Sequence, residues 1–222
     1  HFANANGLHD PNHYVTAYDM AMITRAASKY SVFNDIVNTT TYTIKHNNKR
    51  KTDATAIQRH KMVWPTSGYY YDGIIGGKTG FTDQSGTTLV TYAKRNGMTL
   101  IAVVLHSNGT NVYKDTKELL DYGFNNFSRT AVKDLPSKIT RHLLPAEKYI
   151  LKDYKDDMLF ETRRTASVSL PTGVDTSALE KTYSITKNPA GLPLLTVTYT
   201  YNDHVVGSAR YYQTRLLSDQ LL

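Results

Sequence analysis

The sequence predicts a mixed α and β domain over residues 1–127, followed by a small all-β domain over residues 128–222. Two observations support this fold class. In the first part, apolar residues recur at helical spacing in some segments and alternate with polar residues in others. In the second part helical spacing is absent, and short alternating runs are separated by turn residues. A length of 222 residues accommodates two such domains.

Three helices are expected in the first part. Thr16 and Asp19 form a capping-box pattern, a hydroxyl at the helix start and an acid three residues later. A helix over residues 17–29 is therefore predicted, with apolar residues at helical spacing: Met20, Ile23 and Ala27. A short helix is expected around residues 32–37. The third helix, over residues 110–127, is expected to pack on a sheet through Val112, Leu119, Leu120 and Phe124.

Extended segments lie between these helices. Residues 39–45 alternate, are rich in β-branched side chains and end at Asn47-Asn48, which predicts one half of a hairpin. Three further strands are predicted over residues 77–80, 87–93 and 99–105. Asn96-Gly97 separates the last two, and this dipeptide is a strong signal for a hairpin turn.

The second part is predicted to be an antiparallel β domain. Its turn signals include Pro171-Thr172-Gly173 and Asn202-Asp203. Between the turn signals lie the alternating runs at residues 148–151, 166–170, 194–201 and 205–213. Short strands with turns at this spacing are typical of small β domains.

The composition excludes several classes of protein. Hydrophobic residues make up 40% and charged residues 20%, as in a globular protein with a core. No run of 18 apolar residues occurs, so no membrane-spanning helix is predicted. The absence of cysteine removes disulfides, thiol nucleophiles and cysteine-ligated metals.

The net charge of +7 is spread along the chain. Residues 1–127 carry 13 basic and 9 acidic residues (+4), and residues 128–222 carry 13 and 10 (+3). A diffuse basic surface suits an anionic envelope or polymer. The one dense cluster, Lys49-Arg50-Lys51, is interpreted as a solvated turn. No motif of nucleic-acid recognition accompanies the charge, so no nucleic-acid partner is expected.

The segment "IIGGKTGFTDQSG", residues 74–86, places Lys78 among glycines. A phosphate loop would need glycine five residues before Gly77, where Asp72 stands, and a helix after the motif. The residues that follow are polar and rich in turn formers, and they lead into a predicted strand. Spacing and context therefore exclude a phosphate loop.

The other interpretation is the Lys-Thr-Gly strand of serine acyl-transferases that handle penicillin. Lys78 would lie beside a nucleophilic serine, lower its proton affinity and relay protons. The Thr79 hydroxyl would bind the carboxylate of a D-Ala terminus or a β-lactam. Gly80 would let the substrate lie against the strand, and the Phe81 amide would point at the developing oxyanion.

The triplet alone occurs by chance in about one chain in ten of this length. Its surroundings are more specific: "NANGLHDPNHYVTAYDMAMITRA", "GIIGGKTGFTDQSGTTLVTYAKRNGMTLIAVVLHS" and "DTKELLDYGF". Together they resemble the low-molecular-mass penicillin-binding proteins of the D-alanyl-D-alanine carboxypeptidase family. The resemblance implies a partial transpeptidase/β-lactamase-like α+β domain over residues 1–127. Residues 128–222 would then be the β-rich, sandwich-like accessory domain.

That family has two further motifs, Ser-x-x-Lys with the acylated serine and Ser-x-Asn. Ser-x-Asn does not occur in the chain, and Ser-x-x-Lys occurs once, at Ser184–Lys187. This match follows Lys-Thr-Gly and lies in the β-rich part, so it is a poor candidate. The chain also opens on His1 with no signal peptide. The nucleophile is therefore expected in a segment of the same protein that precedes His1.

Several residues outside the motif are further candidates for the site. The family often carries an arginine before the last helix, where this chain has Lys114, so Lys114 or Thr79 would bind the carboxylate instead. Pro11 separates His9 from His13, which argues against a metal site. Lone histidines are expected at the surface or satisfied in the core: His60, His106 and His142. The run Tyr69-Tyr70-Tyr71 could line the cleft, and Asp83 is expected in a turn.

The resemblance implies a serine-type carboxypeptidase that removes terminal D-Ala from peptidoglycan stem peptides and is acylated by β-lactam antibiotics. It implies no metal and no organic cofactor. The expected location is the outer face of the cytoplasmic membrane of a bacterium, with a peripheral membrane contact through the C-terminal side. A β-lactamase-like hydrolase and a non-catalytic envelope-binding protein are the alternatives.

Overall fold

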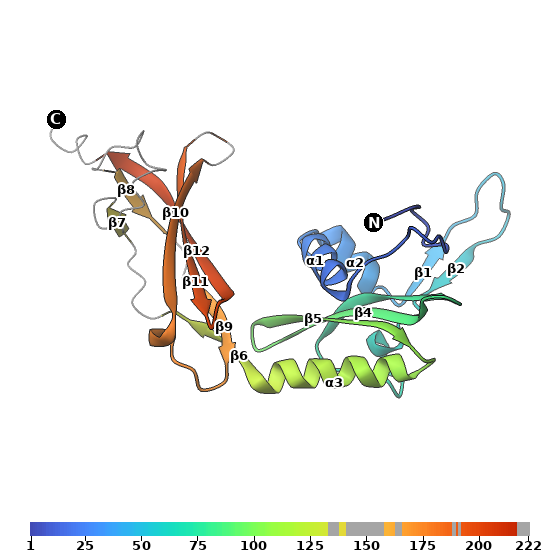
Figure 1. Cartoon of the computed structure of the whole chain (residues 1–222). Coiled ribbons are helices and arrows are strands. Elements are labelled where there is room, and N and C mark those ends of the chain that lie inside the picture. Colours follow the sequence, from blue (N-terminus) through green and yellow to red (C-terminus); the bar gives the residue numbers. More distant parts are fainter. Residues whose placement is uncertain (133–137, 141–157, 163–165, 188–189, 191, 217–222) are drawn as a thin grey trace. The chain divides into compact units, whose positions relative to one another are not determined.

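The computed structural model describes residues 1–132, 138–140, 158–162, 166–187, 190 and 192–216. Contacts divide the chain into two compact units, His1–Asn125 and Asn126–Leu222. Figure 1 follows the elements along the chain. Among the helices that the structure describes, none is long and apolar enough to cross a membrane.

The centre of the first unit is an antiparallel sheet of three strands in the order β3-β4-β5. The strands are β3 (Ile74–Thr82), β4 (Gly86–Arg95) and β5 (Met98–Ser107). The predicted turn at Asn96-Gly97 joins β4 to β5. Both residues have positive φ, 50° and 77°, as the tight hairpin turn requires.

Helices lie on both faces of this sheet (Figure 1). On one face are α1 (Ala17–Ala27) and α2 (Ser31–Asn38), and on the other is α3 (Asn111–Asn126). The capping box is present, since the Asp19 amide donates to Thr16 Oγ1 and the Thr16 amide to Asp19 Oδ2. Both bonds confirm the predicted start of α1. The helix ends at Ala27, two residues earlier than predicted, because the chain turns at Ser28 and Lys29.

The core of the first unit joins α3 to the sheet. Gly123 permits the close approach, because a Cβ there would lie 2.4 Å from the Leu100 side chain of β5. The buried apolar residues of this core come from the sheet, from α3 and from the segment before β3: Met62, Tyr71, Leu89, Ala93, Ala102, Val104, Val112, Tyr113 and Leu120. The predicted packing of the third helix on the sheet is therefore confirmed for Val112, Leu120 and Phe124, whereas Leu119 is 48% exposed.

Tyr71 of this core forms a side-chain hydrogen bond with Asp121. Its hydroxyl donates to Asp121 Oδ1 of α3 at 2.9 Å, and burial raises the pKa of Tyr71 to about 12. Replacing Tyr71 with phenylalanine is expected to lower the free energy of unfolding by about 1–3 kcal/mol, because Asp121 loses a charge-assisted bond. Urea unfolding measures this change. Tyr18→Phe, at an exposed position of α1, is the control, and an equal loss in both variants would contradict the assignment.

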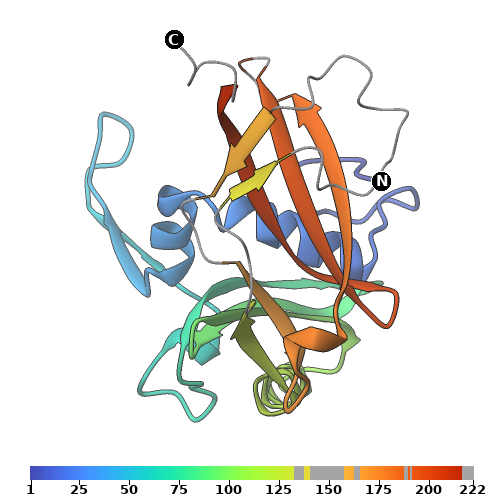
Figure 2. The ribbon, with the colours of Figure 1, turned by 90° about the vertical axis from the view of Figure 1, so that its left-hand side faces the viewer.

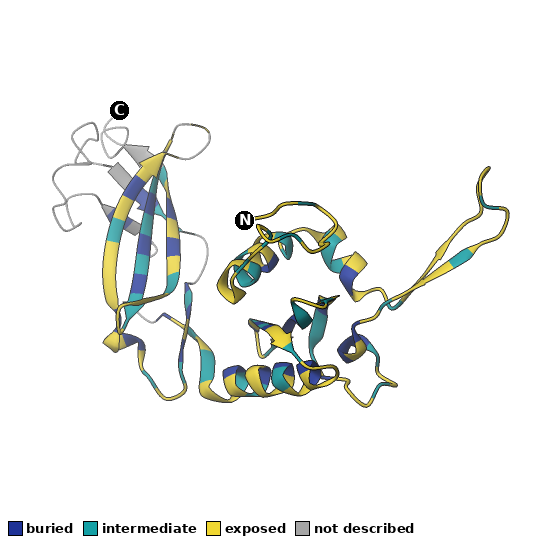
Figure 3. Cartoon of the chain, turned by 45° about the vertical axis from the view of Figure 1, so that its right-hand side comes forward, coloured by how far each residue is buried: buried dark blue, intermediate teal, exposed yellow. Residues whose placement is uncertain are grey.

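A two-stranded hairpin stands apart from the main sheet (Figure 1). It consists of β1 (Thr41–Ile44) and β2 (Ala54–Ile57), as the alternation in residues 39–45 predicted. None of its eight strand residues is buried, which the yellow colouring in Figure 3 makes visible.

The second unit is all-β. A two-stranded sheet pairs β6 (Phe127–Ala131) with β9 (Ser167–Pro171). An antiparallel five-stranded sheet has the order β10-β11-β12-β8-β7. Its strands are β7 (Lys138–Thr140), β8 (Met158–Glu161), β10 (Glu180–Lys187), β11 (Pro193–Tyr201) and β12 (His204–Leu216), drawn together in Figure 2.

Both sheets of this unit contribute to one core. Val168 and Leu170 of β9 join fully buried residues of the larger sheet: Phe160, Leu195, Val197, Tyr199 and Tyr211. Three of the predicted runs correspond to β9, β11 and β12. The run at residues 148–151 and His142 lie outside the described residues. The mixed fold class with several antiparallel sheets is confirmed.

Candidate active site

The predicted site residues all lie in β3. Lys78, Thr79, Gly80 and Phe81 are extended and pair in register with β4, Lys78 opposite Val90 and Gly80 opposite Thr88. After β3 the chain makes a short turn into β4 and no helix follows, which confirms that the segment is not a phosphate loop. Among the described strands only β4 pairs with β3, so β3 is an edge strand of the sheet.

Side chains of β3 alternate between the two faces of the sheet. Lys78 and Gly80 lie on the face that α2 contacts, whereas Thr79 and Phe81 lie on the opposite face. Lys78 is exposed, and its ammonium donates to the Thr79 carbonyl oxygen at 2.5 Å. Phe81 is 68% exposed. The edge therefore offers a cation, a hydroxyl and an open backbone to a ligand.

No serine of the described residues hydrogen-bonds to Lys78. Ser184 and Lys187, the one Ser-x-x-Lys match, lie on β10 of the second unit. Residues three apart on a strand point to opposite faces, so these two side chains do not form a nucleophile–base pair. Their interpretation as a poor candidate is confirmed. The part of the chain that the structure describes thus holds the Lys-Thr-Gly element without a paired serine.

Two glycines before Lys78 fix the position of β3. A Cβ on Gly76 would lie 2.5 Å from Val37 Cγ2 of α2. On the other face, a Cβ on Gly77 would lie 2.1 Å from the Val90 carbonyl oxygen and 2.7 Å from His60 Cδ2. Real Cβ atoms do not tolerate such distances, so both glycines are required for the close packing around this strand. The backbone that leads into Lys78 is therefore held from both faces.

His60 is the residue behind Gly77. It is fully buried at the start of the short helix Lys61–Val63, and its Nδ1 accepts the Met62 amide at 3.2 Å. Its Nε2 therefore carries the proton and donates to Thr91 Oγ1 of β4 at 2.7 Å. Burial lowers the pKa of His60 to about 4, so the ring is neutral at pH 7.

From the sequence alone, His60 is expected either at the surface or satisfied in the core. The structure confirms the second of these and adds the contact with Gly77. No motif or spacing connects His60 with Gly77 or Thr91, because the contact arises only when the loop before β3 folds against the sheet. The sequence therefore had no signal for it.

The remaining residues that the sequence suggested for the site are Lys114, the tyrosine run at residues 69–71 and Asp83. Lys114 is exposed on α3 and its Nζ lies 3.9 Å from Glu118 Oε1. Tyr69 is partly exposed and its ring lies 4.7 Å from that of Tyr113, whereas Tyr71 is buried in the core. Asp83 is exposed in the turn between β3 and β4, as expected.

No metal centre is formed among the described residues by three or more metal-ligating side chains. His13 accepts the Ala3 amide through Nδ1, at 3.2 Å. This bond ties the N-terminal loop together.

The first unit is similar to a known protein family. Residues 1–109 match the family model of D-alanyl-D-alanine carboxypeptidases. The D-alanyl-D-alanine carboxypeptidase DacA of Haemophilus influenzae is 34% identical over 136 residues, which cover 57% of this chain and 30% of the relative. DacC of Escherichia coli, with the same enzyme name, is 27% identical over 197 residues, which cover 87% of this chain and 44% of the relative.

A solved structure shares the fold. Penicillin-binding protein 5 from Haemophilus influenzae superposes with a TM-score of 0.59 at 23% identity, over 94% of this chain and 58% of that one. The chain spans less than half the length of the two curated relatives above. Residues 1–109, which include all of β3, are thus similar to the D-alanyl-D-alanine carboxypeptidase family.

Proposed function

We propose that the protein containing this chain is a serine-type D-alanyl-D-alanine carboxypeptidase that trims peptidoglycan stem peptides. The observation that carries the proposal is the Lys-Thr-Gly element on the open edge of β3, within the family match. Lys78 is the proposed catalytic residue. Thr79, Gly80 and Phe81 are the proposed substrate-binding residues.

The chemistry would run through an acyl-enzyme. A serine from a segment outside this chain attacks the carbonyl carbon of the penultimate D-Ala, and terminal D-Ala leaves with a proton. Water then attacks the ester and restores the serine. The Lys78 ammonium, close to this serine, would stabilise the alkoxide and pass the proton between serine and leaving group. A β-lactam would form the same ester and occupy the site.

The geometry of β3 supports the binding roles. An extended peptide can add to an open sheet edge through main-chain hydrogen bonds, and Gly80 has no side chain to obstruct it. Thr79 is half-buried, and its hydroxyl has no hydrogen-bond partner among the described residues, so it is available for a carboxylate. The Phe81 amide, one residue further, would donate to the oxyanion.

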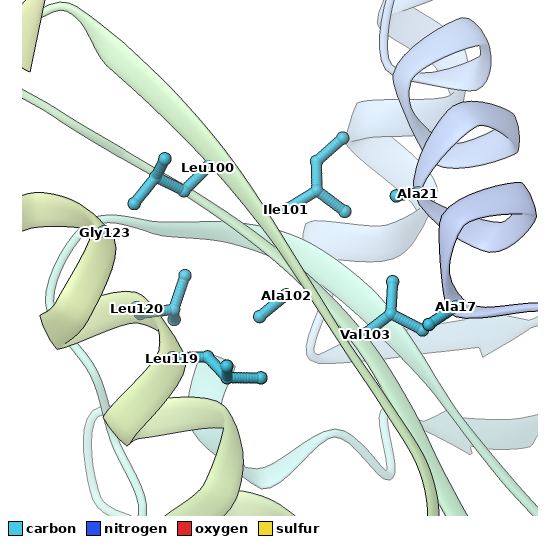
Figure 4. A pocket seen from close by; sticks show the side chains of 9 residues that line it. All are labelled: Ala17, Ala21, Leu100, Ile101, Ala102, Val103, Leu119, Leu120 and Gly123. Atoms are coloured by element: carbon cyan, nitrogen blue, oxygen red, sulfur yellow. The ribbon is translucent and has the colours of Figure 1, made fainter. Parts of the chain in front are cut away.

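The other edge of the sheet supports the proposal that further chain completes this unit. Beside β5 lies an apolar hollow of about 290 Å³ (Figure 4). Ile101 and Val103 point toward α1, and Leu100 and Ala102 point toward α3. Proteins rarely leave such an edge uncovered. The segment that carries the serine is the proposed cover.

The substrate would be a stem peptide that ends in D-Ala-D-Ala, and β-lactam antibiotics would be the covalent inhibitors. The proposed location is the outer face of the cytoplasmic membrane, and the net charge of +7 suits an anionic envelope. A peripheral contact of the C-terminal side with that membrane also stays a proposal. Neither the β-lactamase-like hydrolase nor the non-catalytic binding protein has support from the relatives above, which carry the carboxypeptidase name.

Labelling with a fluorescent penicillin tests the proposed function. The full-length protein is expected to form a covalent adduct that survives denaturing electrophoresis, and excess unlabelled penicillin should prevent it. The 222-residue chain alone is expected to take no label, because its described residues hold no serine paired with Lys78. An unlabelled full-length protein would contradict the carboxypeptidase proposal. A labelled short chain would contradict the assignment of the nucleophile to another segment.

A further inference from the structure

The hairpin β1–β2 exposes apolar side chains without a partner in its unit. Tyr42 is 63% exposed, Ile44 43% and Ile57 64%. A two-stranded hairpin is only marginally stable in water by itself, and its cross-strand pairs do not require apolar side chains to face the solvent. These residues are therefore better explained by a surface that covers them than by the fold of the unit.

The register of the hairpin sorts these side chains onto two faces. Tyr42 lies opposite Ala56 and Ile44 opposite Ala54, so these four residues form one continuous apolar face. The other face carries three threonines and Ile57. The hairpin is thus amphipathic, and we call the first surface the Tyr42–Ile44 face.

A basic loop connects the two strands. Residues 45–53 contain four basic residues, Lys45, Lys49, Arg50 and Lys51, and one acid, Asp53. Four positive charges less one negative charge leave +3, which is three of the seven net charges of the whole chain in nine residues.

The loop is held in a defined shape. Arg50 donates from Nε to the Thr52 carbonyl oxygen at 3.1 Å and from Nη2 to the Ile44 carbonyl oxygen at 2.9 Å. The Asn47 side-chain oxygen accepts the Lys49 and Arg50 amides, each at 2.9 Å. Lys45 pairs with Asp53 at 2.9 Å. The side chains of Lys49 and Lys51 are exposed and can therefore contact an anionic ligand.

We propose that the hairpin β1–β2 docks the protein on a bilayer containing anionic phospholipids. The Tyr42–Ile44 face lies against the boundary between headgroups and acyl chains, where tyrosine is favoured. Lys49 and Lys51 reach the phosphate groups of the headgroups. A soluble polyanion would use the basic loop but would leave the Tyr42–Ile44 face in water. The bilayer is the partner that engages both features.

This surface lies on the first unit, its residues are outside β3, and it does not depend on the proposed enzymatic activity. It also differs from a contact through the C-terminal side of the chain. The hairpin would hold the protein at the membrane by itself or in addition to such a contact.

Flotation of the 222-residue chain with vesicles tests the proposal. Binding is expected to vesicles of phosphatidylcholine and phosphatidylglycerol, and to be much weaker with phosphatidylcholine alone. Lys49→Gln with Lys51→Gln should weaken binding about 30-fold, since each basic residue contributes about 1 kcal/mol at an anionic surface. Lys181→Gln with Lys187→Gln removes the same charge from exposed positions of β10 and should change binding far less.

A second pair of variants separates a bilayer from a soluble polyanion. Tyr42→Ser with Ile44→Ser should weaken vesicle binding about tenfold or more, because the apolar face is lost, while binding to soluble polyphosphate stays unchanged. Tyr18→Ser, at an exposed position of α1, is the matched control. Circular dichroism checks that each variant keeps its fold.

Three outcomes would overturn the proposal. The first is no binding of the wild-type chain to anionic vesicles. The second is vesicle binding that both hairpin variants retain, which would place the contact elsewhere. The third is vesicle binding lost with the lysines but unaffected by the loss of Tyr42 and Ile44, which would identify the hairpin as a polyanion site instead.

Discussion

Replacing Lys78 with alanine in the full-length protein is expected to lower the rate constant of acylation by penicillin by about 10²–10⁴-fold, the range of a general acid–base group. Lys78 would be the cation beside the serine oxygen as negative charge develops there. Its exposed ammonium is bound only to the Thr79 carbonyl among the described residues, so removing it should not disturb the sheet. Stopped-flow measurement with a fluorescent penicillin gives the rate constant.

Two further variants test whether the loss of acylation is specific to Lys78 and whether it comes from proton transfer or from charge. Lys94→Ala removes an exposed lysine from the neighbouring strand β4 and should leave acylation within about twofold of wild type, as surface substitutions usually do. Lys78→Arg keeps the charge, but a guanidinium cannot give up its proton near neutral pH. If Lys78 relays protons, arginine should restore little of the rate. Full activity in Lys78→Arg would show that only the charge matters.

The first unit is expected to lose about 3 kcal/mol of stability between pH 6.5 and pH 4 through His60 alone. Burial lowers the pKa of His60 from 6.5 to about 4. Below pH 6.5 the unfolded chain binds a proton at His60 that the folded chain does not, so acid favours unfolding. Each pH unit in this window costs about 1.4 kcal/mol. Below pH 4 both states are protonated and the loss stops.

Trp64 is a suitable reporter for this experiment, because it is the single tryptophan and lies four residues after His60 in the first unit. Its indole Nε1 donates to the Gln58 carbonyl oxygen at 3.0 Å. Urea unfolding followed by its fluorescence gives the free energy of unfolding at each pH. In His60→Gln the carboxylates still titrate, but the slope due to His60 should vanish. Identical pH profiles for both proteins would contradict a neutral, buried His60.

The sequence predicted the features that local chemistry decides. The Thr16 and Asp19 capping box located the start of α1. Asn96-Gly97 located the turn from β4 to β5, because few residues accept positive φ there. The Lys-Thr-Gly triplet predicted an extended site strand because its neighbours on both sides have strand or turn character.

What the sequence did not predict depends on contacts between distant segments. His60 meets Gly77 and Thr91 only after three separate stretches fold together. From the sequence, Tyr71 could line the cleft as well as Tyr69, since adjacent tyrosines look alike until packing buries one of them. The sequence indicates only a solvated turn at the basic loop, because the significance of the loop depends on the apolar face beside it.

The close packing around Gly76 and Gly77 also predicts which positions of this site tolerate substitution. A side chain at Gly76 or Gly77 would push β3 away from Val37 or His60, so variants there should lose the fold before they alter ligand preference. Phe81 is mostly in solvent and meets no such constraint. Under the proposed function, variants with altered β-lactam susceptibility should therefore carry substitutions at Phe81 and keep both glycines.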